Sequence, residues 1–332
     1  MLVASCRPRD LHQEPFPGIV PRASYLLAGA TGTARAFATS AQPMWKHALL
    51  TTAILAVIAT LAGVVVVYGG LYGMSSTSPH LQPVFTVLEK AMHASVQLRA
   101  RDIQAPPGLD DPATLQSGAV CFRQHCVQCH GGPGVAPDAI GKGMQPIPGS
   151  LVSAARDWTP GELYWITRHG LKMTGMPAWE FRLADQDLWA LVGFLQRLPL
   201  MSPAAYATVL APLRDRQCPS LEEVKTRNGS PPASGTDYPK GDAEQGRIAL
   251  SQYACTSCHV IPGVTGGDIH VGPPLNGWAR RQWIAGELPN TRANLIAWLR
   301  HPQRIDPLTA MPDLGVTQQH AENMAAYLGS LN

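Results

Sequence analysis

Four of the seven cysteines belong to two copies of one short motif. Each copy reads Cys-x-x-Cys-His, and the copies occupy Cys126–His130 and Cys255–His259. Two cysteines three positions apart lie on the same side of a helical turn, where their thiols can add to the two vinyl groups of one haem. The histidine that follows directly is then carried to the iron as an axial ligand. The motifs predict two covalently bound haem c groups, attached at Cys126, Cys129, Cys255 and Cys258.

A Cys-x-x-Cys pair by itself also occurs in redox-active and zinc-binding proteins. A redox-active pair does not require a histidine directly after the second cysteine. A zinc ribbon would need the two pairs to converge, although a long stretch of chain separates them. The complete motif, present twice, therefore favours haem over both alternatives.

A Met-Pro pair follows each motif at a distance, at Met176 and at Met311. The soft thioether of methionine favours ferrous iron, and a His/Met ligand pair raises the reduction potential of a haem. The intervening chain is long enough to pass round a haem edge to the opposite face. We predict that His130 and Met176 ligate one iron and that His259 and Met311 ligate the other. Rival ligands, which we interpret as core or loop residues, are Met144, Met173, Met201, His169 and His270.

The two motifs lie in an internal repeat. A glycine precedes each motif, Gly118 in the first unit and Gly246 in the second. After the motif, each unit has a loop rich in Gly and Pro, a predicted helix, the Met-Pro pair and a final predicted helix. The loops are Pro146–Leu151 and Gly272–Leu275. The repeat indicates two domains of the same kind.

Both units resemble class I cytochromes c, the small all-helical family in which Cys-x-x-Cys-His begins a haem pocket that a methionine closes. The resemblance covers residues 113–200 and 241–332. In that family, a glycine on the first helix allows an aromatic residue of the last helix to pack close. The matching positions in this chain are Gly118 with Phe194 and Gly246 with Tyr327.

The same family uses a Gly-Pro-x-Leu loop whose proline carbonyl accepts a hydrogen bond from the haem-ligating histidine. Gly272–Leu275 matches this loop, so the resemblance implies that the Pro273 carbonyl orients His259. The first unit departs from the pattern, because its loop, Ile147–Leu151, is one residue longer. Which carbonyl serves His130 is left open by the sequence.

An apolar segment precedes both units. No Asp, Glu, Lys or Arg occurs from His47 to Leu88, and Ala48–Gly73 is long and apolar enough to span a bilayer as a helix. The alternative is a cleaved signal peptide, but the run exceeds the usual apolar core of about 7–15 residues and no clear Ala-x-Ala site follows it. Lys46 and the arginines before it predict a cytoplasmic N-terminal side. The haem motifs would then lie on the periplasmic side of the inner (cytoplasmic) membrane.

The predicted fold class is all-α, with two class I cytochrome c domains in tandem after one transmembrane helix. Residues 1–43 form an uncertain leader, interpreted as a mis-chosen start or alternatively as a transit peptide. A short amphipathic helix near the membrane surface is predicted from Val84, Val87, Leu88 and Met92, with Pro106–Gly108 ending it. The predicted segments are 1–43 leader, 44–73 anchor, 74–112 juxtamembrane linker, 113–200 first domain, 201–240 linker containing Pro, Gly and Ser, and 241–332 second domain.

Three cysteines lie outside the motifs. Cys6 belongs to the leader, whereas Cys121 and Cys218 flank the first domain. Outside the cytoplasm these two thiols could form a disulfide that ties the start of the domain to the linker that leaves it. They could equally be two isolated buried thiols, because sequence does not report the distance between their Cα atoms.

The formal net charge of +3 does not predict a nucleic-acid partner. With His and Met on both irons, a substrate could reach iron only by displacing a ligand, which favours electron transfer over catalysis. The chain would then be an electron-transfer protein or a non-catalytic subunit of an oxidoreductase complex. By analogy with the family, its redox partners would be an upstream respiratory donor and a terminal haem-copper oxidase. The alternatives are the cytochrome subunit of a membrane alcohol or aldehyde dehydrogenase, a dihaem peroxidase and a redox sensor.

Overall fold

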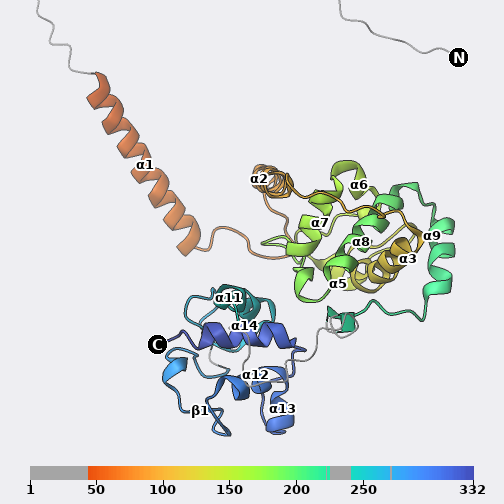
Figure 1. Cartoon of the computed structure of the whole chain (residues 1–332). Coiled ribbons are helices and arrows are strands. Elements are labelled where there is room, and N and C mark those ends of the chain that lie inside the picture. Colours follow the sequence, from red (N-terminus) through yellow and green to blue (C-terminus); the bar gives the residue numbers. More distant parts are fainter. Residues whose placement is uncertain (1–43, 222, 225–240, 270) are drawn as a thin grey trace, which may run out of the picture. The chain divides into compact units, whose positions relative to one another are not determined.

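The computed structural model describes residues 44–221, 223–224, 241–269 and 271–332. The predicted leader with Cys6, the later part of the predicted 201–240 linker and the rival ligand His270 lie outside the described residues. The chain divides after Tyr72 into an N-terminal part and a C-terminal part, which are treated separately below. Helices account for most of the regular structure in the described part of the chain, as the sequence predicts (Figure 1).

The N-terminal part contains α1, Met44–Tyr68. Its candidate membrane span is Trp45–Tyr68, 24 residues, and none of that span is buried. A helix of this length rises about 36 Å, which exceeds the roughly 30 Å hydrocarbon core of a bilayer. The helix is therefore compatible with a single-pass anchor.

The first helix of the C-terminal part is α2, Gln82–Ala100, where the sequence predicts an amphipathic helix. The predicted apolar positions Val84, Val87 and Leu88 are largely exposed, and the buried face consists of Val96 and Ala100. The helix ends at Ala100, before the predicted stop at Pro106–Gly108. The periodicity thus identified the helix, but the buried residues of α2 lie in its C-terminal half.

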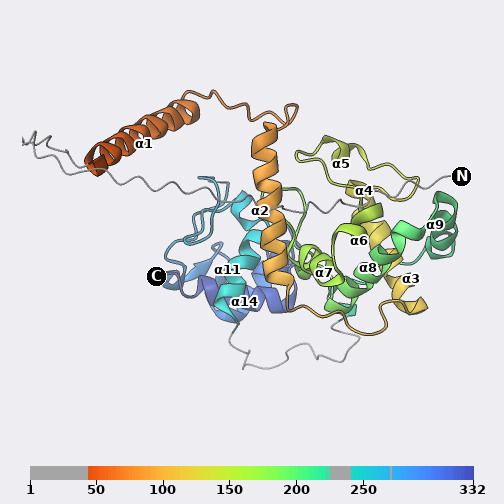
Figure 2. The ribbon, with the colours of Figure 1, turned by 90° about the horizontal axis from the view of Figure 1, so that it is seen from above.

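One cluster of buried hydrophobic residues is built around α3 and α8, which lie side by side (Figures 1 and 2). Helix α7 begins with a capping box, in which Thr159 and Glu162 each bond the backbone of the other. The elements of this part are α3 Pro112–Cys121, the π-helix η1 Phe122–Cys126, α4 Val127–His130, α5 Ala139–Gly143, η2 Leu151–Ser153, α6 Ala154–Asp157, α7 Pro160–His169, η3 Trp179–Phe181, α8 Asp185–Arg197 and η4 Leu198–Leu200.

A second cluster is built around α11 and α14. The side chain of Asp242 accepts hydrogen bonds at the start of α11, and Thr317 does the same at the start of α14. A short antiparallel hairpin of β1 and β2 departs from the all-α prediction. The elements are α11 Ala243–Gln252, η6 Cys255–Ser257, η7 Trp278–Arg280, β1 Trp283–Ile284, β2 Leu288–Pro289, α12 Arg292–Arg300, α13 Pro302–Ile305 and α14 Gln318–Leu328.

The segment from residue 201 onward, predicted as linker, is helical at its start. Helix α9 spans Pro203–Leu210 and is followed by η5, Ala211–Leu213. Tyr206 and Leu213 are buried in the first hydrophobic cluster. The early part of the predicted linker therefore packs against the first cluster, because it carries apolar side chains that the Pro and Ser content obscures.

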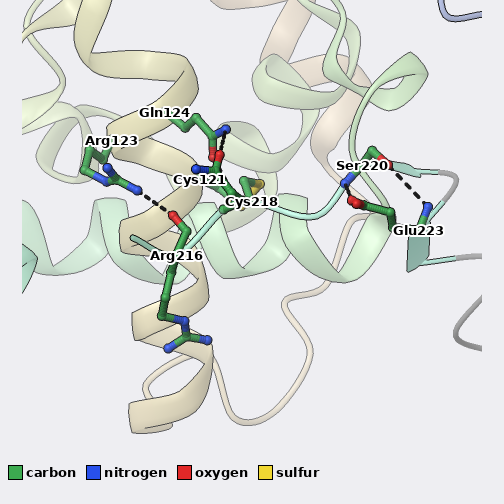
Figure 3. Close-up of a disulfide and its surroundings, with 8 residues drawn as sticks. Cys121, Arg123, Gln124, Arg216, Cys218, Ser220 and Glu223 are labelled. Carbon is green, nitrogen blue, oxygen red and sulfur yellow. Dashed lines mark hydrogen bonds between the residues drawn. A yellow bond between two sulfur atoms is a disulfide. The ribbon is translucent and has the colours of Figure 1, made fainter. Parts of the chain in front are cut away.

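A disulfide joins Cys121 at the end of α3 to Cys218, with 4.8 Å between their Cα atoms (Figure 3). Hydrogen bonds reinforce the link on both sides. Arg123 donates to the carbonyl of Arg216 at 2.6 Å, and the Gln124 side chain accepts from the Cys218 amide at 2.7 Å. Of the two alternatives that the sequence left open, the structure has the disulfide.

Candidate haem-binding sites

The two Cys-x-x-Cys-His motifs are reached by different backbone routes. The first leaves α3 through the π-helix η1, which ends at Cys126 and runs into α4. The second leaves α11 through Ala254, whose φ of 56° is left-handed, and continues into η6. Single-turn π-helices commonly mark functional sites, and a non-glycine residue with positive φ persists only where its surroundings impose it. Both motifs therefore begin at an irregularity in a helix end.

Each motif histidine is oriented by a loop carbonyl. His259 Nδ1 lies 2.8 Å from the carbonyl oxygen of Pro273, which confirms the bond implied by the Gly-Pro-x-Leu loop. His130 Nδ1 lies 2.6 Å from the carbonyl oxygen of Gly149. In both loops the acceptor is the second residue before the leucine, Leu151 or Leu275. The additional residue of the first loop consequently leaves the acceptor position unchanged.

These two bonds determine which ring nitrogen is available. A carbonyl oxygen only accepts hydrogen bonds, so Nδ1 of His130 and of His259 must carry the proton and donate it. The Nε2 atom then presents its lone pair, as a haem-ligating histidine requires. Burial lowers the pKa of His130, against the opposing effect of its bond to Gly149, and so favours the neutral ring. Both histidines therefore have the tautomer that an axial haem ligand needs.

The Met-Pro pairs share a local structure that the sequence analysis missed. The backbone N–H of Met176 donates to the hydroxyl of Thr174 at 3.0 Å, and that of Met311 donates to the hydroxyl of Thr309 at 3.3 Å. Both methionines are partly buried against their own hydrophobic cluster. The repeated Thr-x-Met-Pro pattern was the available signal, and it indicates that both loops present methionine in the same way.

The rival ligands in the first unit have other surroundings. Met173 is 78% exposed. Met201, which directly follows η4, packs against the first hydrophobic cluster. Met144 is half-buried and lies close to Gly175. His169 is exposed at the end of α7, with its Nδ1 3.4 Å from a carboxylate oxygen of Glu180. The contacts of Met173, Met201 and His169 therefore match the surface and core roles expected of them.

The first cysteine of each motif is buried, and its thiol has a raised pKa. Burial, followed by the neighbouring Cys129, raises the pKa of Cys126 to about 12. Burial is also the main cause that raises the pKa of Cys255 to about 11. Redox-active and zinc-binding cysteines need the thiolate, which an electropositive site stabilises. The described residues also contain no group of three or more His, Cys, Asp or Glu side chains that could hold a metal ion directly. In each motif, two cysteines that form no disulfide lie beside a histidine oriented by a loop carbonyl, and this arrangement fits haem c.

Close helix contact at the predicted glycines is present in both units. A Cβ atom on Gly118 would overlap the Ala190 carbonyl and lie 2.9 Å from Cβ of Phe194, which confirms the predicted aromatic neighbour. A Cβ atom on Gly246 would overlap the backbone of Asn323. The atoms nearest to that Cβ belong to Asn323 and Met324, so the pairing of Gly246 with Tyr327 stays a prediction.

Each histidine is followed by a loop on which a tyrosine packs. Tyr327 of α14 donates its hydroxyl to the Pro262 carbonyl at 2.7 Å. In the first unit the tyrosine comes from α9, and the Tyr206 side chain lies against Gly132. Tyr206 is 2% exposed, its hydroxyl has no hydrogen-bond partner among the described residues, and burial raises its pKa to about 12. Sequence reasoning missed Tyr206 because it assigned that residue to a linker.

The two tyrosines predict opposite effects of the same substitution. Tyr206→Phe removes a buried hydroxyl that has no partner in the described part of the chain, so the free energy of unfolding should stay constant or rise by up to about 1 kcal/mol. Tyr327→Phe leaves the Pro262 carbonyl without its donor and should lower that free energy by about 1 kcal/mol. Urea unfolding of the full chain in detergent, followed by circular dichroism, measures both. An equal loss in the two variants would contradict the assignment for Tyr206.

One comparison with known proteins falls on the segment that contains the first motif. The family described as cytochrome c oxidase, cbb3-type, subunit III matches residues 113–195. Cytochrome c oxidase subunit 2 of Alkalihalophilus pseudofirmus is 37% identical over 92 residues, which are 27% of this chain and 25% of that protein. The chain thus matches about a quarter of that relative's length. No solved structure is significantly similar to the chain. Residues 113–195 therefore contain a cytochrome c domain, a type of domain that carries covalently bound haem c.

Proposed function

We propose that the chain is a membrane-anchored dihaem c-type cytochrome that transfers electrons outside the cytoplasm. One observation carries this proposal. The two motif histidines have the same orienting hydrogen bond, from Nδ1 to a loop carbonyl. Cys126 and Cys129 would hold one haem and Cys255 and Cys258 the other, with the axial ligands named above. Bound haem supplies a one-electron couple. The chain supplies attachment, ligand orientation and shielding from water.

The anchor and the compartment rest on separate observations. Helix α1 is long and apolar enough to cross a bilayer and is exposed along its length. The Cys121–Cys218 disulfide fits an oxidising compartment, as expected for a domain on the periplasmic side. We therefore place the haem segments on the periplasmic side of the inner membrane.

The direction of electron flow is proposed from similarity alone. The matching family and the relative from Alkalihalophilus pseudofirmus both bear names of cytochrome c oxidase subunits. We propose that this chain accepts electrons from a respiratory donor and delivers them to a terminal oxidase. The proteins that co-purify with the chain test this step separately from its haem content.

One preparation tests both parts of the proposal. The full chain is purified from membranes in mild detergent, its haem is determined per chain, and its reoxidation in air after ascorbate reduction is followed. We expect two haems in the wild type and one after Cys255→Ala with Cys258→Ala, because one attachment site is lost. Co-purifying oxidase subunits with cyanide-sensitive reoxidation would support the terminal step.

The matched control is Cys126→Ala with Cys129→Ala, which should also leave one haem. Wild type with a single haem would refute the dihaem proposal. A co-purifying substrate dehydrogenase that reduces the haems would instead place the chain on the input side of the pathway.

A further inference from the structure

The short helix η3, Trp179–Phe181, begins two residues after Pro177 of the Met-Pro pair and carries two buried aromatic residues. Their side chains contact different hydrophobic clusters. Trp179 belongs to the first cluster, whereas Phe181 is 5% exposed and belongs to the second. This three-residue helix therefore contributes one side chain to the hydrophobic cluster of each haem-binding segment.

At one end, this series of contacts reaches the first haem motif. The ring of Trp179 lies with its centroid 4.9 Å from that of His125. His125 directly precedes Cys126, the first haem-attaching cysteine of the proposed site. Burial lowers the pKa of His125, so the ring beside Trp179 is neutral at physiological pH. The contact is therefore one between two uncharged rings.

At the other end, the contacts reach the second motif. The centroid of Phe181 lies 6.5 Å from that of Tyr253 in an edge-to-face arrangement and 5.1 Å from that of His320. Tyr253 donates its hydroxyl to the Phe181 carbonyl at 3.3 Å. The Cys255 sulfur lies 4.0 Å from the Tyr253 carbonyl oxygen, and Cys255 is the first cysteine of its motif.

Polar contacts hold this arrangement from outside the ring cluster. The guanidinium of Arg182 donates to the Gln252 carbonyl at 3.2 Å and to the Ala178 carbonyl at 3.1 Å. The Arg182 carbonyl accepts from the Leu221 amide at 3.1 Å. Hydrogen bonds from a charged donor are among the stronger polar contacts. Phe181 is consequently fixed on the residues that lead into the second motif.

We propose that the series His125, Trp179, Phe181 and Tyr253 is the path along which electrons pass between the two haem-binding segments. The inference rests on the proposed dihaem function. In each transfer one ferrous iron is oxidised and one ferric iron is reduced by a single electron, and no bond forms or breaks. Trp179 and Phe181 are joined through the backbone of η3, and the role of Phe181 is to connect that helix to the residues before the second motif.

The test substitutes Phe181 in the full, haem-loaded chain in detergent. One haem is reduced by a short light pulse with a photoreductant, and the redistribution of the electron is followed by absorbance. For Phe181→Ala we expect the rate to fall about tenfold, which corresponds to about 1.4 kcal/mol in activation free energy. Amide hydrogen exchange at Gln252–Ala254 should accelerate in the same variant, because the ring that covers this turn is removed.

Two further variants complete the design. Phe181→Leu retains an apolar side chain for folding but removes the ring, and it too should slow the redistribution. Phe85→Ala makes the same change on the exposed part of α2 and should leave the rate unchanged. Two haems with an unchanged rate in both Phe181 variants would overturn the path. A single haem in the wild type would instead refute the proposed function on which the path depends.

Discussion

Replacing Met176 or Met311 by alanine will lower the reduction potential of one haem and leave the other unchanged. A thioether ligand stabilises ferrous iron, so its loss favours the ferric state. Axial ligands set haem potentials over a range of about 0.8 V. We expect a drop of more than about 59 mV, a tenfold change in a one-electron equilibrium. A redox titration of the full chain, followed in the haem absorbance bands, measures the shift for each haem.

Met173→Ala is the matched control for the first site. Met173 lies in the same loop as Met176, but it is 78% exposed. Its removal should leave both potentials unchanged. Met144 offers a stricter comparison, because it is half-buried and lies close to Gly175, next to Met176. A drop for Met144→Ala with no drop for Met176→Ala would reassign the ligand to Met144.

Loss of the Cys121–Cys218 disulfide will strongly destabilise the first cytochrome segment. The bond closes a loop with a sequence separation of 97 residues. A disulfide closing a loop of roughly this size restricts the unfolded chain by about 4.7 kcal/mol in the entropy model, and removing a native disulfide typically costs about 2–5 kcal/mol. We expect Cys121→Ala with Cys218→Ala to lower the free energy of unfolding within that range. Urea unfolding measured by circular dichroism gives the value.

The double substitution avoids leaving a reactive thiol, and reduction of the wild type with dithiothreitol provides an independent comparison. The hydrogen bonds of Arg123 to Arg216 and of Gln124 to Cys218 remain available in the variant. If these bonds alone hold the segment, both the variant and the reduced protein will unfold at the wild-type urea concentration. That outcome would contradict a stabilising role for the disulfide.

The predictions of haem attachment and of the apolar helix depend on residues close together in the chain. The spacing within Cys126–His130 and Cys255–His259 suffices to predict haem attachment. The uninterrupted apolar composition of Ala48–Gly73 suffices to predict a long helix, and α1 occupies most of that range. Gly118 and Gly246 were recognised because the same order of elements recurs, and both lie where a side chain would meet the opposing helix.

Composition and periodicity did not show every packing contact of two other segments. The residues after Met201 contain enough Pro and Ser to suggest a linker, yet α9 places Tyr206 in the first hydrophobic cluster. In α2, the predicted apolar positions Val84, Val87 and Leu88 are exposed, as a helix near a membrane surface allows, and the buried residues are Val96 and Ala100. In both cases the periodicity of a short segment contains no information about which distant surface will cover it.

The sequence by itself therefore predicted haem attachment at both motifs and the order of elements around each motif, because two cysteines and a histidine at this fixed short spacing have few other uses together. Only the tertiary structure decided that Gly149 orients His130, that Cys121 pairs with Cys218 and that Phe181 packs on the second cluster. Each of these contacts joins residues that are distant in the chain. Their formation depends on loop closure and on the packing of whole helices, which no local pattern of residues encodes.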